Sequence, residues 1–304
     1  MSEHLSAEPR PAGYRPRHAR RPADQPRAAR PRSSSRALPL PAEIGRQLKR
    51  RRTQGIFIVV ILLPLILIGA FALGNDDADP GPRGFVDLAQ ESGANLVVFA
   101  LFASTSFLLI VIVALFAGDT VPSEASWSSL RYLLAAPVRR ERLLRQKLIV
   151  AGIFSVVALV LLPAWTLLVG GLAYGWGPYV GPTGDQIGWP EFGWRLLIIT
   201  GYLLISLLVV GSFAFALGAW TDAPLAAVGG AVLLMILSAI LDSITALGGI
   251  RQGLPGHYAY AWADALASTI DYSDMVTGAL WSIGYAVVLI SAAVWHFLRK
   301  DITS

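Results

Sequence analysis

Cysteine is absent from the 304 residues of this chain. That absence excludes disulfide bonds, thiolate metal sites and a cysteine nucleophile. Histidine is scarce as well, and no two of its four copies lie at a spacing typical of metal ligands. Charged residues make up 15% of the chain, whereas soluble domains carry about 25%. The composition is therefore that of a membrane protein.

Sequence motifs for catalysis are also missing. No Gly-x-x-x-x-Gly-Lys-Ser/Thr loop occurs, so the chain is not expected to bind ATP in the Walker manner. The long apolar segments hold almost no ionisable residue apart from Asp242 and His296 near their ends, which argues against an ion-coupled transporter. His257 shares a polar stretch with three acids, and we interpret these as solvated loop residues: Asp264, Asp271 and Asp274. We expect neither an enzyme nor a metal or cofactor on this chain.

Long apolar segments are what the sequence does have. An 18-residue helix covers roughly 27 Å, close to the hydrocarbon thickness of a bilayer. Alternation of period two is missing, and 304 residues offer too little polar surface to cover six buried helices in a soluble protein. The chain is therefore predicted to be an all-α polytopic membrane protein with six transmembrane helices. Their predicted bounds are 56–73, 95–117, 148–174, 195–220, 225–247 and 275–298.

Positive charges predict the orientation of these helices. Fourteen Lys and Arg precede Ile56, six lie between Gly118 and Lys147, and two follow the last apolar segment. Six spans put these three groups on one side, so 22 of the 25 positive charges would be cytoplasmic. Both termini are then expected inside.

The first 42 residues differ in composition from the rest of the chain. They hold nine Arg and eight Pro and scarcely any large apolar residue, so we expect a disordered cytoplasmic tail. Contact with anionic lipid headgroups is a plausible use of such a tail, whereas Tyr14 as its sole aromatic residue disfavours nucleic-acid binding.

The stretch 41–52 is predicted to form a short amphipathic helix before the first span. Ile44 and Leu48 lie four residues apart beside a basic flank, as in helices that lie along a membrane surface. A cleaved signal peptide is the alternative for this start, since Ala70-Phe71-Ala72 resembles a cleavage site. The basic region before it is too long for that interpretation.

The most informative segment is 118–147, between the second and third spans. Trp127, Leu130 and Leu134 are spaced to form one apolar stripe on a helix, which Pro137 then ends. A second, basic helix would begin at Val138 and continue into the third span. The pattern predicts an elbow of two helices that a cytoplasmic partner could bind. A passive position on the inner leaflet, or a role in topology alone, are the alternatives.

This segment resembles the inner loop of type-2 permease subunits of ATP-binding-cassette exporters. The matching residues are Gly118-Asp119, Ser123-Glu124, Leu130-Arg131-Tyr132-Leu133-Leu134-Ala135-Ala136-Pro137-Val138, Arg140-x-Arg142-Leu143-Leu144 and Lys147. The chain departs from the family at Ser128-Ser129, where the family often has Gly-Thr. The six-span layout with both ends inside extends the resemblance over residues 43–300, and the tail 1–42 is not covered.

The resemblance implies a function and a set of partners. Such permeases pair with a second permease and with separate ATPase subunits, which would bind the ATP and Mg²⁺. The inner loop would be the coupling helix that contacts the ATPase. Carried over to this sequence, the contact residues are Glu124, Trp127, Leu130, Arg131, Leu134, Pro137, Arg139 and Arg140. The family also has short re-entrant helices in the last outer loop, and residues 258–270 fit such a helix.

These observations together predict a permease subunit of an ATP-driven exporter in a bacterial cytoplasmic membrane. Two alternatives stay open: a membrane scaffold or sensor that recruits a cytoplasmic protein, and an autonomous secondary transporter. Small residues at close spacings in the fourth and fifth spans predict close helix packing, either inside the bundle or at a dimer seam. They are Ser212, Ala214, Ala216, Gly218, Ala226, Gly229, Gly230 and Ala231.

Overall fold

The computed structural model describes residues 40–74, 84–119, 140–221 and 223–299. The chain divides into a unit of residues 1–35 and a unit of residues 36–304, and every described residue belongs to the second unit. Residues 1–39 of the predicted tail therefore lie outside the described residues, and its last three residues, 40–42, are helical and not disordered as predicted.

Long apolar helices dominate the second unit, as predicted. Five are long and apolar enough to cross a membrane, and a bent pair of helices brings the number to six if it is taken as one span. The described residues thus have the fold of an all-α polytopic membrane protein. Two of these helices contain an internal proline: Pro64 lies in α2 (Arg51–Gly74) and Pro163 in α8 (Arg140–Tyr174).

The predicted amphipathic helix is confirmed as α1 (Leu40–Leu48), which ends shortly before α2 begins. Its two faces are used differently from the expectation. Glu43 and Gln47 are buried, while Leu48 is exposed and Ile44 is half-buried against the core. The polar face of α1 therefore packs against the rest of the protein. Partners described below form ion pairs with the buried Glu43.

The predicted second span is broken, which corrects the expectation of one continuous helix over 95–117. Helix α4 (Gly93–Thr105) and helix α5 (Leu108–Gly118) meet at an angle of 59°. Thr105 donates its hydroxyl hydrogen to the carbonyl oxygen of Leu101 at 2.7 Å, and the chain leaves helical geometry at Phe107. Short hydroxyl side chains that bond to the backbone compete with helical hydrogen bonds and often bend helices.

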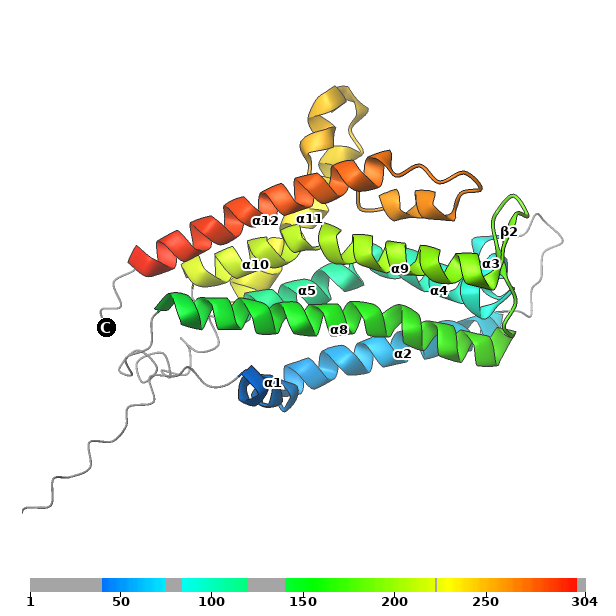
Figure 1. Ribbon diagram of the computed structural model, residues 1–304, viewed down its shortest axis with the longest axis horizontal. Helices are drawn as coiled ribbons and strands as arrows, with labels where there is room; N and C mark the ends of the chain where they lie inside the picture. The colour runs from blue at the N-terminus through cyan, green and yellow to red at the C-terminus, as the bar shows by residue number, and fades with distance from the viewer. Residues whose placement is uncertain (1–39, 75–83, 120–139, 222, 300–304) are drawn as a thin grey trace, which may run out of the picture. The chain divides into compact units, whose positions relative to one another are not determined.

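The predicted fourth span, 195–220, begins earlier than expected and is formed by two consecutive helices. They are α9 (Trp189–Ser206) and α10 (Leu208–Thr221), which together count as one candidate span. The last two long helices are α11 (Pro224–Asp242) and α12 (Ser273–Arg299). Figure 1 shows these helices running along one another, with α5 and α10 inside the bundle.

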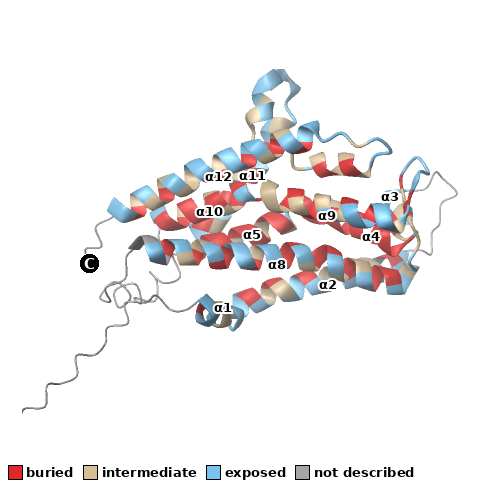
Figure 2. Cartoon of the chain, viewed as in Figure 1, coloured by how far each residue is buried: buried red, intermediate tan, exposed pale blue. Residues whose placement is uncertain are grey.

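The core lies around α5 and α10, whose residues are mostly buried (Figure 2). Ser212, Ala214, Ala216 and Gly218 of α10 are buried within this chain. A Cβ added at Gly118 of α5 would contact Ala214 at 3.4 Å, so these helices approach closely. The small residues of α10 thus pack inside the bundle, whereas Ala226 and Gly229 of α11 are exposed.

A two-stranded hairpin follows α8. Strands β1 (Tyr179–Val180) and β2 (Gln186–Ile187) are antiparallel, with Tyr179 opposite Ile187 and Val180 opposite Gln186. Asn95 of α4 holds β1 through both of its amide atoms, at 2.8 Å to the Val180 carbonyl and 2.9 Å from its backbone nitrogen. A short helix, α3 (Phe85–Ala89), precedes α4.

The connection from α11 to α12 differs from the prediction in its details. Helix α11 ends at Asp242 and not near residue 247, and a 3₁₀ segment, η2 (Thr245–Gly253), follows it. Gly248 has a φ of +52°, which interrupts regular helix there. Within the predicted helix 258–270, the structure has a shorter 3₁₀ helix, η3 (Ala261–Leu266), anchored by the fully buried Trp262.

Candidate functional site

The predicted docking residues lie outside the described part of the chain, with one exception. Arg140 is the first residue of α8, and its side chain is not described. The predicted contact residues therefore stay a prediction: Glu124, Trp127, Leu130, Arg131, Leu134, Pro137 and Arg139. What the structure does describe is how both flanks of the 118–147 segment are held.

A buried ion pair holds the flank on the α8 side. Lys147 of α8 donates to the carboxylate of Glu43 in α1 at 2.8 Å, and the two residues are 6% and 2% exposed. Arg46 reaches the same carboxylate oxygen at 2.9 Å. Burial would raise the pKa of Glu43, but the hydrogen bonds and positive charges of Arg46 and Lys147 together lower it below its ordinary value.

A second set of ion pairs holds the flank on the α5 side. Asp119 directly follows α5 and lies 2.8 Å from Arg52 and 3.6 Å from Arg50. Burial raises the pKa of Asp119 above its ordinary value, even though both arginines act to lower it. The side chains around Asp119 and Glu43 together form what we call the inner ionic cluster: Glu43, Arg46, Arg50, Arg52, Asp119 and Lys147.

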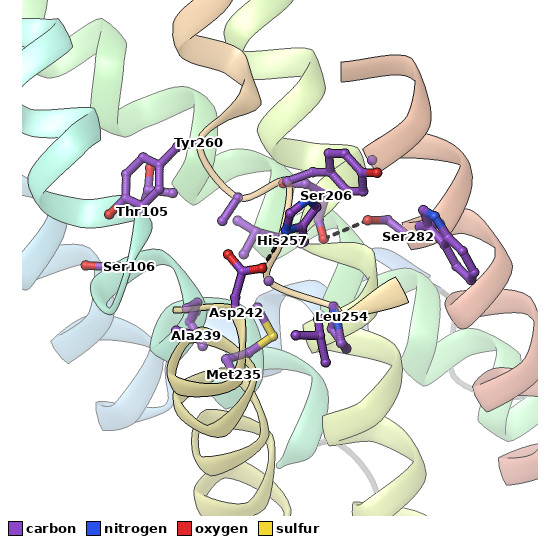
Figure 3. A pocket seen from close by; sticks show the side chains of 18 of the residues that line it. Thr105, Ser106, Ser206, Met235, Ala239, Asp242, Leu254, His257, Tyr260 and Ser282 are labelled. Atoms are coloured by element: carbon purple, nitrogen blue, oxygen red, sulfur yellow. Dashed lines mark hydrogen bonds and ion pairs between the residues drawn. The ribbon is translucent and has the colours of Figure 1, made fainter. Parts of the chain in front are cut away.

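A cavity of about 180 Å³ forms a second site, between the break of α4 and α5 and the end of α11. Five elements contribute to its lining: the α4–α5 break, α9, α11, α12 and the chain from 254 to 260. Figure 3 shows Thr105 and Ser106 on one side of it and Ser282 of α12 on the other. Irregular backbone inside a membrane protein is tolerated where it is buried in protein or lines a cavity.

An ionisable group lies at the centre of this view. The Nδ1 atom of His257 lies 2.5 Å from Oδ1 of Asp242, and Nε of Arg251 lies 3.3 Å from the same oxygen (Figure 3 shows the Asp242–His257 contact). Asp242 and His257 line the cavity, whereas Arg251 does not. Whether Nδ1 donates or accepts in this contact depends on the tautomer of His257.

Hydroxyl groups fasten the chain from 253 to 258 over the cavity. Tyr202 of α9 donates to the carbonyl of Tyr258 at 2.6 Å, and Tyr285 of α12 donates to the carbonyl of Gly253. Ser238 of α11 accepts from the backbone nitrogen of Gly256 at 2.9 Å. The aromatic side of the cavity is thus held in place by bonds to three helices.

The three acids that follow His257 in the sequence are not bonded to the Asp242–His257 pair. His257 contacts Asp242 and none of the three acids that follow it in sequence. Burial, together with the charges of Asp274 and Asp271, raises the pKa of Asp264, while hydrogen bonds from Ser273 lower that of Asp271. In the described ranges, no three His, Asp or Glu side chains are grouped to hold a metal ion.

A comparison with known families identifies a match over most of the chain. Residues 56–303 match the family described as "Protein of unknown function (DUF2705)". The chain belongs to that family. No curated protein matches it. The matched range of this DUF2705 member includes the 118–147 segment and the whole cavity, and excludes α1 and Glu43.

Both sites contain residues that sequence reasoning did not bring together. Glu43 and Lys147 are 104 positions apart, and Asp242 and His257 are 15 apart across a turn of irregular chain. One signal was available for the second pair, since Asp242 is a rare ionisable residue at the end of an apolar segment. No comparable signal marks Glu43 among the polar residues before the first span.

Proposed function

We propose that this chain is the membrane-spanning permease subunit of an ATP-driven exporter, with the 118–147 segment as the docking element for a separate ATPase. The inner ionic cluster carries the proposal. Its ion pairs connect one flank of that segment to α1 and the other to α2. A displacement of the segment would therefore be transmitted to both α5 and α8. Helix α8 then runs for 35 residues and would carry such a displacement along the bundle.

The proposed topology has six spans, with the bent pair α4–α5 as the second. Gly93 at the start of α4 touches Gly171 near the end of α8, and Asp119 after α5 touches Arg52 at the start of α2. These contacts support a course of α4–α5 along the length of the bundle. The distribution of Lys and Arg supports cytoplasmic termini. The proposed location is a bacterial cytoplasmic membrane.

The proposed partners follow from the resemblance of the segment to type-2 permease subunits. An ATPase would contact Glu124, Trp127, Leu130, Arg131, Leu134, Pro137, Arg139 and Arg140, and would itself bind ATP and Mg²⁺. A second permease chain would complete the transport path, and anionic lipids would surround the basic inner end. Transport would proceed by alternating access of the paired permeases.

Affinity purification of the tagged chain from its own membranes in mild detergent tests the proposal. We expect near-stoichiometric recovery of a protein with Walker motifs. The double substitution Leu130→Asp and Leu134→Asp should abolish that recovery, because it places two carboxylates on the apolar stripe. Ser129→Asp adds a charge beside the stripe and is the matched control that should retain the partner. Recovery of the chain alone, or with a regulator that lacks Walker motifs, would overturn the exporter proposal and favour a scaffold.

The Asp242–His257 pair favours a second candidate, an ion-coupled transporter that works without an ATPase. Ionisable groups at a cavity between membrane helices are typical of such proteins. Reconstitution of the chain alone in liposomes separates the two functions. Uptake driven by an imposed proton gradient in the absence of ATP would support this candidate against the exporter.

A further inference from the structure

The cavity near Asp242 has an uneven distribution of charge. Asp242 and His257 are its ionisable groups besides tyrosine, and among the described residues that line it none is Lys or Arg. Arg251 contacts Asp242 from outside the lining. A ligand in the cavity would therefore face the carboxylate, and Arg251, the arginine paired with that carboxylate, is not among the residues that line the cavity.

The hydroxyl groups of the cavity add hydrogen-bond acceptors. A hydroxyl has one hydrogen, and once it donates this hydrogen its oxygen can still accept. Five lining hydroxyls already donate to backbone carbonyls, namely those of Thr105, Tyr202, Ser206, Ser282 and Tyr285. Four side chains of the lining have a hydrogen-bond donor without a partner among the described residues: Ser106, Tyr258, Tyr260 and Trp281. With the Asp242 carboxylate and the oxygens of the five donating hydroxyls, acceptors nevertheless predominate.

Aromatic rings form much of the remaining lining. They belong to Tyr202, Tyr258, Tyr260, Trp281 and Tyr285. The face of an aromatic ring attracts a cation, with Trp and Tyr more effective than Phe. Trp281 and Tyr260 are 45% and 41% exposed, so they lie where a ligand could enter. Aromatic faces, acceptors and one carboxylate all favour the same ligand charge.

We propose that this cavity binds a small organic ammonium ion that carries an apolar group about the size of one ring. The volume supports the size, because a cavity of about 150 Å³ holds benzene and this one measures about 180 Å³. The ammonium hydrogens would bond to Asp242 and to the neighbouring acceptors, and the ring would lie among the aromatic side chains. This inference is independent of the exporter proposal, since it concerns binding to the chain without ATP or an ATPase.

Three probes of nearly equal size and different charge test the inference. Phenethylamine is an ammonium ion at neutral pH, 2-phenylethanol is neutral, and phenylacetate is an anion. Their binding to the purified full chain in mild detergent is measured by equilibrium dialysis, with protein-free micelles as the blank. We expect phenethylamine to bind about tenfold more tightly than the alcohol and phenylacetate not to bind. Equal affinities, a preference for the anion, or no binding above the blank would overturn the proposal.

Two variants locate the binding. Ala239→Trp fills the cavity from an exposed position on α11 and should abolish binding of both the amine and the alcohol. Ala226→Trp, at another exposed position on α11, is its matched control and should bind as the unmodified chain does. Unchanged binding in Ala239→Trp would place the ligand elsewhere and overturn the proposal.

The charge of the carboxylate is tested with Asp242→Asn. This variant should lower the affinity for phenethylamine to that for 2-phenylethanol, while Asp185→Asn in the β1–β2 turn should change neither. If Asp242→Asn unfolds, as judged by circular dichroism, Ala239→Trp and the three-probe comparison decide the question. A folded Asp242→Asn that retains the tenfold preference for the amine would contradict the proposed contact.

Discussion

Two buried carboxylates at the same end of the bundle have opposite electrostatic environments. Glu43 receives hydrogen bonds from Lys147 and Arg46, and these outweigh the cost of its burial. Asp119 pairs with Arg52, whose side chain is 66% exposed, and burial remains the larger effect on its pKa. The charge of Glu43 is thus stabilised by the fold, whereas that of Asp119 is tolerated.

We predict that Glu43→Gln lowers the free energy of unfolding by about 3 kcal/mol, because breaking a buried ion pair by removing one of its charges is strongly destabilising. The buried ammonium left behind would be that of Lys147. Denaturation in mild detergent, followed by circular dichroism, measures the change. Asp119→Asn is the comparison and should cost far less. The double variant Glu43→Leu with Lys147→Met should regain most of the loss, and a loss equal to that of Glu43→Gln would contradict the prediction.

The two carboxylates also predict opposite responses to acid. The pKa of Glu43 is lowered from 4.5, so its stabilising contribution is complete above pH 4.5 and is lost as the pH falls through the lower folded value. The pKa of Asp119 is raised from 3.8, so ionisation costs stability as the pH rises through the higher folded value. The stability difference between the unmodified chain and Glu43→Gln should therefore shrink below pH 4.5.

At the scale of elements, the crossing of α4 and α8 depends on glycine. A Cβ added at Gly93 would lie 2.5 Å from the backbone nitrogen of Gly171, and one at Gly170 would lie 3.1 Å from Cα of Gly93. The atoms that a Cβ at Gly93 would meet are backbone atoms, which cannot turn away as a flexible side chain can. Small residues allow membrane helices this close approach.

We predict that Gly93→Ala lowers the free energy of unfolding by about 1–3 kcal/mol, because the two helices must separate to admit the methyl group. Gly69→Ala in α2 is the matched control, since a Cβ there meets nothing within 4 Å. Alanine is the better helix former, so this control should be neutral or slightly stabilising. Thermal denaturation of both variants in the same detergent makes the comparison. Equal effects of the two substitutions would contradict the tight crossing.

Hydropathy predicted the existence of the long helices but not their interruptions. The apolar run through α4 and α5 continues across Ser106, and the run of α11 continues beyond Asp242. Both breaks occur where polar side chains find tertiary partners or backbone acceptors. A pattern of apolar residues does not contain that information, because a helix can accommodate serine and threonine without breaking.

At the scale of the whole molecule, charged contacts gather several helix ends in one place. The inner ionic cluster joins α1, the start of α2, the end of α5 and the start of α8. The ring of Trp220 at the end of α10 lies 6.3 Å from that of His296 near the end of α12. Figure 1 shows α1 and the last turns of α12 at the same end of this unit, opposite the β1–β2 hairpin. An even number of crossings fits this arrangement.

We predict that labelling of single cysteines will place these two ends on opposite sides of the membrane. The natural chain has no cysteine, so each introduced thiol is the sole target. In intact cells, a membrane-impermeant maleimide should label Asp185→Cys and Gln252→Cys, which replace exposed residues. Lys49→Cys, also exposed, should react after permeabilisation and not before. Labelling of Lys49→Cys and Asp185→Cys from the same side would exclude the six-span topology.

The sequence alone determined the class of the protein and the approximate place of its helices. Apolar length and the low proportion of charge are local properties, and they suffice to predict helices that can cross a bilayer. The same reading anticipated α1. It predicted a longer helix over 258–270, where the structure has the shorter η3. It also identified the 118–147 segment, whose described flanks are now known to be held by ion pairs.

The tertiary structure decided which polar residues meet. Glu43 has no feature that marks Lys147, 104 residues away, as its partner. His257 lies closer in sequence to Asp264 and Asp271, which it does not contact, than to Asp242. The cavity exists because α4 and α5 bend, α11 stops at Asp242 and the chain returns through residues 254–260. These events depend on packing between distant segments, which residue periodicity cannot encode.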